Sequence, residues 1–350
     1  MRTYKVPQTD LVVSRIAYGC GMLGGWDKRP LSADAITKAV RVINTAYDSG
    51  VTFFDHADVY GFGNAETVFG EVLKRSPGLR DKIVIQSKCG QRFQGEPGPR
   101  DPNRMDSSCE HIVRSAQGSL KRLGTDRLDI LLLHLADALL RPDEVAQAFD
   151  ELKQSGTVRY FGVSNHTAGQ IELLRKHVRQ PIVVNQIQLG LAHSYAIADC
   201  LERTLEFAQQ DFTRQALEAT QGKVKVNTTF HHVYTGMAGT GTLDYCRLHD
   251  IQVQAYSPLR GNLLSPSADA LPEVKQCAQI LAFLAREKNT TPAAVALAWL
   301  LAHPAGIVPV IGAMNPAHVI ESCEADRVSL SREEWYSLFA STADLQSRTL

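Results

Sequence analysis

The sequence of 350 residues is long enough to bury a full core, either as one large α/β barrel or as two ordinary domains. Hydrophobic residues make up 44% and charged residues 21% of the chain, which is typical of a globular enzyme and excludes a disordered protein. The 37 Lys and Arg residues balance the 37 Asp and Glu residues, and this net charge of zero argues against nucleic acid or an anionic membrane as a partner.

The amino terminus, residues 1–5, leads into alternating strand-like sequence and not into the apolar stretch of a signal peptide. No later apolar run approaches the length of a membrane span. We therefore expect a cytoplasmic protein. The seven cysteines are scattered and include no Cys-x-x-Cys pair, so we expect reduced thiols and neither a redox motif nor a zinc site.

Eight short apolar runs alternate with amphipathic stretches along the chain. This alternation is typical of repeated βα units around a parallel sheet. Several of the runs are apolar on both faces, as buried parallel strands are. The predicted strands centre on residues 16–18, 52–54, 83–85, 130–133, 160–163, 182–184, 253–256 and 307–310.

Several of the intervening helices have recognisable start and stop signals. The first helix starts at a Ser, the second at a Ser with a Glu three residues later in a capping-box pattern, and the third at an Asp. A Gly marks the end of each. The predicted helices run from Ser32 to Gly50, from Ser107 with Glu110 to Gly124, and from Asp143 to Gly156.

Eight strands, each followed by a helix, suit a closed (βα)8 barrel, although an open doubly wound sheet gives much of the same alternation. The first strand is followed by GCGMLGG over residues 19–25. This segment has the wrong spacing for a Gly-x-Gly-x-x-Gly dinucleotide loop, and no helix starts directly after it. We therefore predict an α/β fold of the TIM-barrel type, with a single domain over residues 1–350.

The connection between the sixth and seventh strands, residues 189–249, is far longer than a usual βα loop. Residues 190–241 are therefore predicted to be an insertion in the barrel. Within it, the helical spacing of Leu201, Leu205, Ala208 and Phe212 predicts an added helix. The glycine-rich residues 236–242 lack the Lys of a phosphate loop and fit a hinge. A lid, a subunit contact and inert decoration remain open as roles of the insertion.

Polar side chains end three of the apolar strands. Asp55 ends the second, Lys88 the third and His134 the fourth, and Tyr60 follows Asp55 in the next loop. Each residue alone has an ordinary structural explanation, but in an α/β barrel these strand ends gather at one face. An ammonium beside a phenol lowers the pKa of the phenol, so we expect Tyr60 to give a proton to a carbonyl oxygen.

The same segments resemble the aldo-keto reductase family. The motif TFFDHADVYG at residues 52–61 holds the Asp and Tyr at the family spacing, and LKRLGTDRLD at residues 120–129 leads into the strand that ends at His134. The resemblance extends from about Thr9 to Ser331, apart from the long connection. It implies a carbonyl reductase in which Asp55, Tyr60, Lys88 and His134 are the catalytic group.

The resemblance also implies a nicotinamide site. The segment GTVRYFGVSN at residues 156–165 is similar to the one whose Ser and Asn hold the nicotinamide carboxamide, and YSPL at residues 256–259 resembles the stacking aromatic and the loop over the pyrophosphate. Residues 312–322 look like the segment that grips the adenosine phosphate. The implied cofactor-binding residues are Ser164, Asn165, Gln186, Tyr256, Ser257, Leu259, Gly312, Met314, His318, Glu321 and Ser322.

Two departures from the family pattern bear on specificity. The histidine motif reads HLAD at residues 134–137, where relatives have His-Arg-Pro-Asp or His-Trp-Pro, so the substrate side near Leu135 is altered. In the adenosine segment His318 stands where members that prefer NADP carry Lys or Arg, and Ser322 replaces a common Asn. We therefore expect NADP as cofactor, with NAD possible.

The implied activity is hydride transfer between NADP(H) or NAD(H) and an aldehyde, ketone or sugar. The particular substrate, the direction in the cell and the oligomeric state stay open. An alternative function is a nicotinamide-binding regulatory subunit with little turnover, since the family resembles the β-subunits of potassium channels. No metal is expected, because the side chains of the adjacent His231 and His232 would point apart in a strand.

Overall fold

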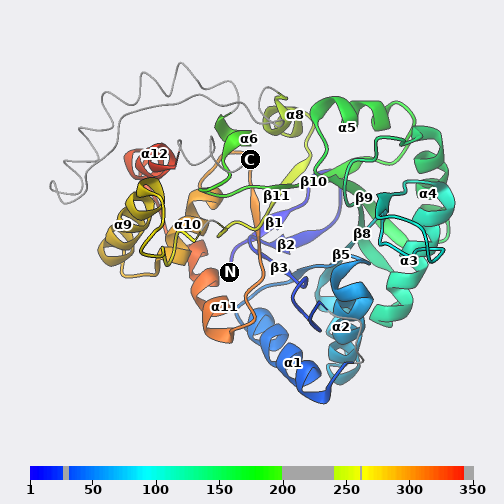
Figure 1. Ribbon diagram of the computed structural model, residues 1–350, viewed down its shortest axis with the longest axis horizontal. Coiled ribbons are helices and arrows are strands. Elements are labelled where there is room, and N and C mark those ends of the chain that lie inside the picture. Colours follow the sequence, from blue (N-terminus) through cyan, green and yellow to red (C-terminus); the bar gives the residue numbers. More distant parts are fainter. Residues whose placement is uncertain (27–30, 199–239, 261, 343–350) are drawn as a thin grey trace.

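The computed structural model describes residues 1–26, 31–198, 240–260 and 262–342. Eight parallel strands close into a barrel, in which each strand pairs with the next one in the barrel and β12 pairs with β3 (Figure 1). All eight predicted strands and the TIM-barrel fold are confirmed. The barrel strands are β3 (Ala17–Gly19), β4 (Phe53–Asp55), β5 (Val84–Cys89), β8 (Leu128–Leu133), β9 (Val158–Ser164), β10 (Ile182–Gln188), β11 (Gln252–Tyr256) and β12 (Val308–Ile311).

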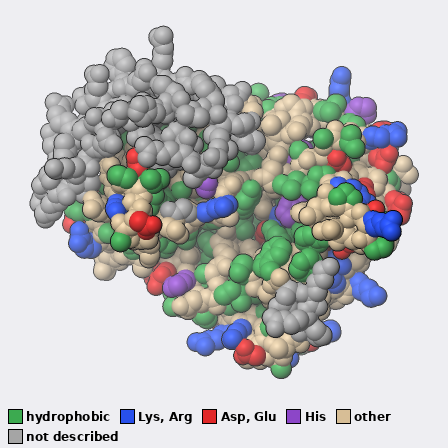
Figure 2. Space-filling model, in the orientation of Figure 1, with side chains coloured by type: hydrophobic (Ala, Val, Ile, Leu, Met, Phe, Trp, Pro, Cys, Tyr) green, Lys and Arg blue, Asp and Glu red, His purple; other side chains and the backbone are tan. Residues whose placement is uncertain are grey.

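Helices surround the barrel, and their apolar faces pack on its outer side (Figure 1). The helices are α1 (Ala33–Asp48), α2 (Asn64–Arg75), α3 (Cys109–Leu123), α4 (Pro142–Gln154), α5 (Ala168–Arg175), α6 (Tyr195–Ala198), α8 (Thr242–Leu248), α9 (Pro272–Glu287), α10 (Pro292–Leu301), α11 (Pro316–Cys323) and α12 (Arg332–Ser341). Within the described ranges, no helix is long and apolar enough to cross a membrane. Figure 2 shows acidic and basic side chains interspersed around the rim of the face in view.

Two antiparallel hairpins accompany the barrel. The amino-terminal hairpin, β1 (Thr3–Lys5) and β2 (Val12–Ser14), places Val6, Leu11 and Val13 in one apolar cluster with inward residues of the strands. It therefore seals the amino-terminal end of the barrel, opposite the strand ends that carry the polar residues. The second hairpin, β6 (Gln91–Arg92) and β7 (Arg104–Met105), lies in the connection after β5 and was not predicted.

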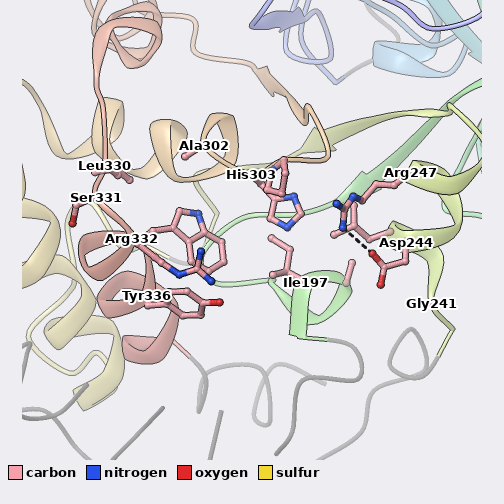
Figure 3. A pocket seen from close by; sticks show the side chains of 14 residues that line it. Ile197, Gly241, Asp244, Arg247, Ala302, His303, Leu330, Ser331, Arg332 and Tyr336 are labelled. Carbon is pink, nitrogen blue, oxygen red and sulfur yellow. Dashed lines mark hydrogen bonds and ion pairs between the residues drawn. The ribbon is translucent and has the colours of Figure 1, made fainter. Parts of the chain in front are cut away.

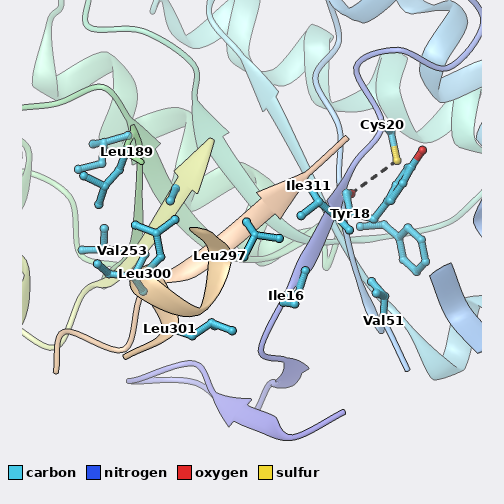
Figure 4. Packing of buried hydrophobic residues seen from close by; sticks show 14 of the residues in the cluster. Ile16, Tyr18, Cys20, Val51, Leu189, Val253, Leu297, Leu300, Leu301 and Ile311 are labelled. Carbon is cyan, nitrogen blue, oxygen red and sulfur yellow. Dashed lines mark hydrogen bonds between the residues drawn. The ribbon is translucent and has the colours of Figure 1, made fainter. Parts of the chain in front are cut away.

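The larger core lies between the strands and the helices. Figure 4 shows part of it, where Leu297 and Leu300 of α10 lie near Val253 of β11. Residues 293–301 of α10 are all buried, as expected of a helix that is apolar on every side. The outer side of the barrel is therefore apolar, and the polar candidate residues lie at the carboxyl ends of the strands.

The predicted helix starts are confirmed in one case and wrong in two. The side chain of Ser32 accepts from the amide of Ala35 and caps α1. The N-cap of α3 is Ser108 and not Ser107, because the Asp106 carboxylate accepts from both the amide and the hydroxyl of Ser108 and shifts the start by one residue.

Helix α4 begins at Pro142, so Asp143 lies inside its first turn. The cause is the fixed φ of proline, which suits the first helical position. The ends near Gly50, Gly124 and Gly156 are confirmed, since the helices stop one or two residues before each glycine.

The connection from β10 to β11 contains α6 and α8 as its described parts. The helix predicted over residues 201–212, most of the glycine-rich stretch and the pair His231 and His232 lie outside the described residues.

Candidate active site

The four predicted catalytic residues meet at the carboxyl end of the barrel. The Nζ atom of Lys88 on β5 lies 2.7 Å from Oδ2 of Asp55 on β4 and 3.1 Å from Oη of Tyr60. The rings of Tyr60 and His134, which directly follows β8, lie edge to face with centroids 5.8 Å apart. Neighbouring strands bring Asp55, Lys88 and His134 together, as expected from their positions at strand ends.

Tyr60 owes its position to a tight turn. It begins a short 3-10 helix (Tyr60–Gly63) that leads into α2. Gly61 has a φ of 55°, and a Cβ atom there would lie 2.4 Å from the carbonyl oxygen of Gly25. Only glycine permits this close approach of the backbone, which directs the phenol over Lys88.

The ammonium of Lys88 is fully buried and paired. Burial lowers its pKa, but the Asp55 carboxylate and the Tyr60 phenol raise it more, so the pKa of Lys88 lies above its ordinary value. Its Nζ atom also donates to the carbonyl oxygen of His56 at 2.8 Å. With three acceptors around it, Lys88 is a fixed positive charge at the floor of the site.

The expected lowering of the Tyr60 pKa is wrong. Burial raises the pKa of the phenol more than the charge of Lys88 lowers it, and Asp55 raises it further. The net shift is upward, so Tyr60 is protonated at neutral pH. Lys88 therefore offsets the cost of forming a buried phenolate without making the phenol acidic in the resting site.

His134 is neutral, because burial and the nearby Lys88 charge lower its pKa to about 3. Its backbone amide donates to the carbonyl oxygen of Cys89 at 2.8 Å, which ties it to the end of β5. A neutral imidazole beside a phenol can donate one N–H to an oxygen atom placed between them.

Three of the predicted cofactor-binding residues form one hydrogen-bonded group next to His134. The Nδ2 atom of Asn165 donates to Oγ of Ser164 at 3.0 Å and to the carbonyl oxygen of His134 at 3.2 Å. The Tyr256 hydroxyl donates to Oδ1 of Asn165 at 3.1 Å. Asn165 has a φ of 59°, a left-handed conformation that asparagine tolerates better than most residues.

Gln186 lies deeper, inside the barrel. Its side-chain nitrogen donates to Oδ1 of Asp55 at 3.0 Å and to Oε1 of Gln254 at 2.9 Å. Both hydrogens of its amide are therefore used within the protein. A contact from Gln186 to a cofactor stays a prediction, and it would have to use the amide oxygen.

A groove of about 470 Å³ runs from the catalytic group toward α11. Of the predicted residues, it is lined by Asp55, Tyr60, Tyr256, Ser257, Leu259, Gly312 and Ser322. The predicted residues outside this lining are Lys88, His134, Ser164, Asn165, Gln186, Met314, His318 and Glu321. His318 is exposed in the first turn of α11, and the Met314 sulfur contacts the hydroxyl of Tyr18.

The groove also contains two residues that the sequence analysis missed. Trp26 is half exposed, and its ring lies against that of Tyr60 with centroids 6.2 Å apart. Arg260 follows the YSPL segment and adds an exposed positive charge to the lining. Trp26 directly follows the GCGMLGG segment at residues 19–25, and Arg260 directly follows YSPL. These positions were the signals that could have identified the two residues.

A second cavity, of about 510 Å³, lies on the outside of the barrel among α6, α8 and α12 (Figure 3). Its lining includes His303, Arg332 and Tyr336, and Arg247 is directed at Asp244, with which it forms an ion pair. None of the predicted site residues contributes to it. The catalytic group and the groove around it are therefore the candidate active site.

Comparisons with known proteins give matches in sequence and in fold. The sequence model of the Aldo/keto reductase family matches residues 15–210 and 213–341. The chain is 32% identical over 333 residues to 6-dehydroglucose reductase of Agrobacterium fabrum, and the match covers 94% of both chains.

Two solved structures share the fold at 24% identity. Glycerol dehydrogenase from Gluconobacter oxydans has a TM-score of 0.75 and covers 99% of this chain and 97% of its own. An aldo-keto reductase from Klebsiella pneumoniae in complex with NADPH has a TM-score of 0.65 and covers 93% of this chain and 90% of its own.

Proposed function

Because this chain belongs to the aldo/keto reductase family, we propose that it transfers a hydride between NADP(H) or NAD(H) and the carbonyl of an aldehyde, ketone or sugar. The observation that carries the proposal is the contact chain from Asp55 through Lys88 to Tyr60, beside a neutral His134, with Asp55 and Tyr60 lining an open groove. A phenol, a buried ammonium and a neutral imidazole in contact support the proposal, because they can serve as proton donor, positive charge and hydrogen-bond donor.

The groove suits an extended dinucleotide. Ser164 and Asn165 are proposed to bind the nicotinamide carboxamide, for which each would exchange a hydrogen bond within the protein for one to the cofactor. Tyr256 offers an aromatic ring beside them. Ser257, Leu259 and the Arg260 guanidinium line the stretch that suits a pyrophosphate. Toward the adenosine end lie Gly312 and Ser322 in the groove, with Met314, His318 and Glu321 beyond it. When bound, the reduced nicotinamide supplies the hydride.

Tyr60 is the proposed general acid. Its raised pKa keeps the phenol protonated until a carbonyl oxygen needs the proton. The Lys88 ammonium at 3.1 Å then stabilises the phenolate that forms, and Asp55 holds Lys88 in place. The His134 imidazole orients and polarises the same oxygen. In the reverse direction the Tyr60 phenolate would take the proton of an alcohol, and the hydride would pass to the oxidised nicotinamide.

Among carbonyl substrates we place sugars first. The relative at 32% identity is named 6-dehydroglucose reductase. The half-exposed ring of Trp26 at Tyr60 also gives the groove a flat apolar surface beside the proton donor. NADP is the proposed cofactor because the Klebsiella relative is solved with NADPH, and NAD stays the alternative because His318 is the only basic residue in residues 312–322.

The test is a matrix of NADH and NADPH against aldehydes, ketones and sugars, followed by absorbance at the reduced-nicotinamide band. We expect turnover with at least one sugar or aldehyde, and loss of that turnover in Tyr60→Phe. Binding of cofactor without turnover of any carbonyl would contradict the proposal and favour the regulatory subunit.

A further inference from the structure

Three buried glutamine side chains and the Asp55 carboxylate form a closed hydrogen-bonded ring inside the barrel, which we call the glutamine ring. The glutamines are Gln86 on β5, Gln186 on β10 and Gln254 on β11, each at most 1% exposed. Strand alternation explains their shared direction, because Gln86 stands two residues before Lys88 and Gln254 two residues before Tyr256. Strand pairing sets Gln86 beside Asp55 and Gln254 beside Gln186.

Two amide nitrogens of the ring bridge two oxygen atoms. Nε2 of Gln86 donates to Oδ1 of Asp55 at 2.6 Å and to Oε1 of Gln254 at 2.8 Å. Nε2 of Gln186 donates to the same two oxygens, at 3.0 and 2.9 Å. An amide NH2 group has two hydrogens, so both nitrogens are fully used.

Gln254 decides which way the other two amides face. Its own Nε2 donates to Oε1 of Gln86 at 3.0 Å and to Oε1 of Gln252 at 3.1 Å, which holds its oxygen toward the nitrogens of Gln86 and Gln186. If Gln254 were reversed, its NH2 group would face two other NH2 groups. A buried arrangement of that kind loses several hydrogen bonds at once.

The Asp55 carboxylate receives donors on both oxygens as a result. Lys88 binds Oδ2, and the nitrogens of Gln86 and Gln186 bind Oδ1. Donors directed at a carboxylate stabilise its charged form. The orientation of Gln186 also leaves its amide oxygen as the atom that can face a cofactor carboxamide.

We propose that Gln254 is a positioning residue, which orients the amides of Gln86 and Gln186 so that they hold the Asp55 carboxylate charged and aimed at Lys88. This inference rests on the proposed function, because Asp55 and Lys88 act there through Tyr60. Gln254 itself lies outside the groove lining, so its effect passes through its neighbours.

The test compares Gln254→Met with Gln252→Met. Methionine has nearly the size of glutamine but cannot orient the two amides. Gln252 is buried two residues earlier on the same strand, where it accepts one hydrogen bond from Gln254, and Gln254 keeps its bond to Gln86 in the control. Both variants remove one buried amide from the barrel interior.

For Gln254→Met we expect kcat to fall by about tenfold, the usual effect of losing hydrogen bonds to a charged group, with KM for the carbonyl within about twofold. The pH profile of kcat should also change, because the Asp55 carboxylate has lost directed donors. For Gln252→Met we expect near-normal kcat and an unchanged profile. If both variants lower kcat alike and leave the pH profile unchanged, the ring is only packing and the inference is wrong.

Cofactor binding separates this inference from the proposed function. If the wild-type protein binds NADPH but reduces no carbonyl, the proposed function fails, while an NADPH fluorescence titration still tests Gln254. We expect severalfold weaker binding for Gln254→Met and unchanged binding for Gln252→Met, because only the first frees the Gln186 amide. Equal affinities would overturn the inference.

A second variant covers the case in which Gln254→Met does not fold. Gln254→Glu keeps the size and the acceptor oxygens but removes the amide nitrogen that donates to Gln86 and Gln252. The pH profile should therefore differ from that of the wild type. A pH profile like that of the wild type would show that Gln254 does not act on Asp55.

Discussion

The Lys88 ammonium lies 3.1 Å from the Tyr60 hydroxyl, yet the pKa of Tyr60 is raised. The two facts fit one mechanism. A protonated phenol is the form that gives a proton to a carbonyl oxygen, and the buried ammonium acts on the phenolate that remains. In the proposed mechanism the contact would therefore contribute more in the transition state than in the resting site.

The first prediction concerns the proton donor. Tyr60→Phe removes the phenolic oxygen and keeps the ring that packs against Trp26 and His134. We expect kcat to fall by on the order of 10²-fold or more, the usual contribution of a general acid, with cofactor affinity nearly unchanged. Steady-state kinetics and a cofactor fluorescence titration measure the two quantities. Near-normal turnover would mean that another group supplies the proton.

The second prediction concerns the buried ion pair. Lys88→Met should remove activity at neutral pH and also destabilise the fold by about 3–5 kcal/mol, because Asp55 is left as a buried unpaired charge. The double variant Asp55→Asn with Lys88→Met should recover much of that stability and none of the activity. Urea unfolding and kinetics on the three proteins check this. Recovery of activity in the double variant would contradict the assigned role of Lys88.

The parts of this site that could be predicted from the sequence are those fixed by local position. Asp55, Lys88 and His134 each end an apolar run, and a barrel brings such ends together whatever the details of packing. The strand pattern also fitted an open doubly wound sheet, and the closed barrel was preferred because no Gly-x-Gly-x-x-Gly loop follows the first strand. The start of α3 was missed by one residue because it depends on Asp106, a side chain outside the helix.

The glutamine ring and the pKa of Tyr60 could not be predicted in this way. The hydrogen bonds of Gln254 to Gln86 and Gln186 join residues 168 and 68 positions apart, and nothing in a single strand indicates such partners. The pKa of Tyr60 depends on how completely the phenol is buried, because burial raises this pKa and the Lys88 charge lowers it. Both properties arise only once the barrel has closed.

The third prediction concerns acid stability. Both ring nitrogens of His56 are buried and have no hydrogen-bond partner among the described residues. Burial and the nearby Lys88 charge lower the pKa of His56 to about 3. The unfolded chain takes up this proton near pH 6.5, so the unfolded state binds more protons between about pH 6.5 and 3. Stability contributed by the neutral ring is present above pH 6.5 and is lost as the pH falls.

His56→Phe should remove this dependence and keep an aromatic ring against Phe69. Between pH 7.5 and 4.5 the variant should lose about 2 to 3 kcal/mol less unfolding free energy than the wild type. Urea unfolding at the two pH values measures this difference. Replacement of the exposed His318 by Asn serves as the control and should behave like the wild type. Equal losses in the wild type and His56→Phe would show that His56 is not kept neutral in the fold.

The last prediction concerns the choice between NADPH and NADH. Substitutions in α11 and in the loop after β11 test it separately. His318 is exposed in the first turn of α11, beyond the lining of the groove that we propose for the cofactor. His318→Arg places a permanent charge there with a geometry suited to phosphate. We expect the ratio of NADPH to NADH affinity to rise by about tenfold, since a charged hydrogen bond contributes on the order of 1.5–3 kcal/mol.

Two further variants show whether this effect is local. Ala317→Arg adds the same charge to the neighbouring exposed position of α11 and should change the ratio little. Arg260→Met should weaken the binding of both cofactors by the same factor, because Arg260 lines the part of the groove that we propose for the pyrophosphate common to both. Fluorescence titration of each protein with NADPH and NADH gives all the ratios. If His318→Arg and Ala317→Arg raise the ratio equally, the gain comes from net charge and His318 does not face the 2′-phosphate.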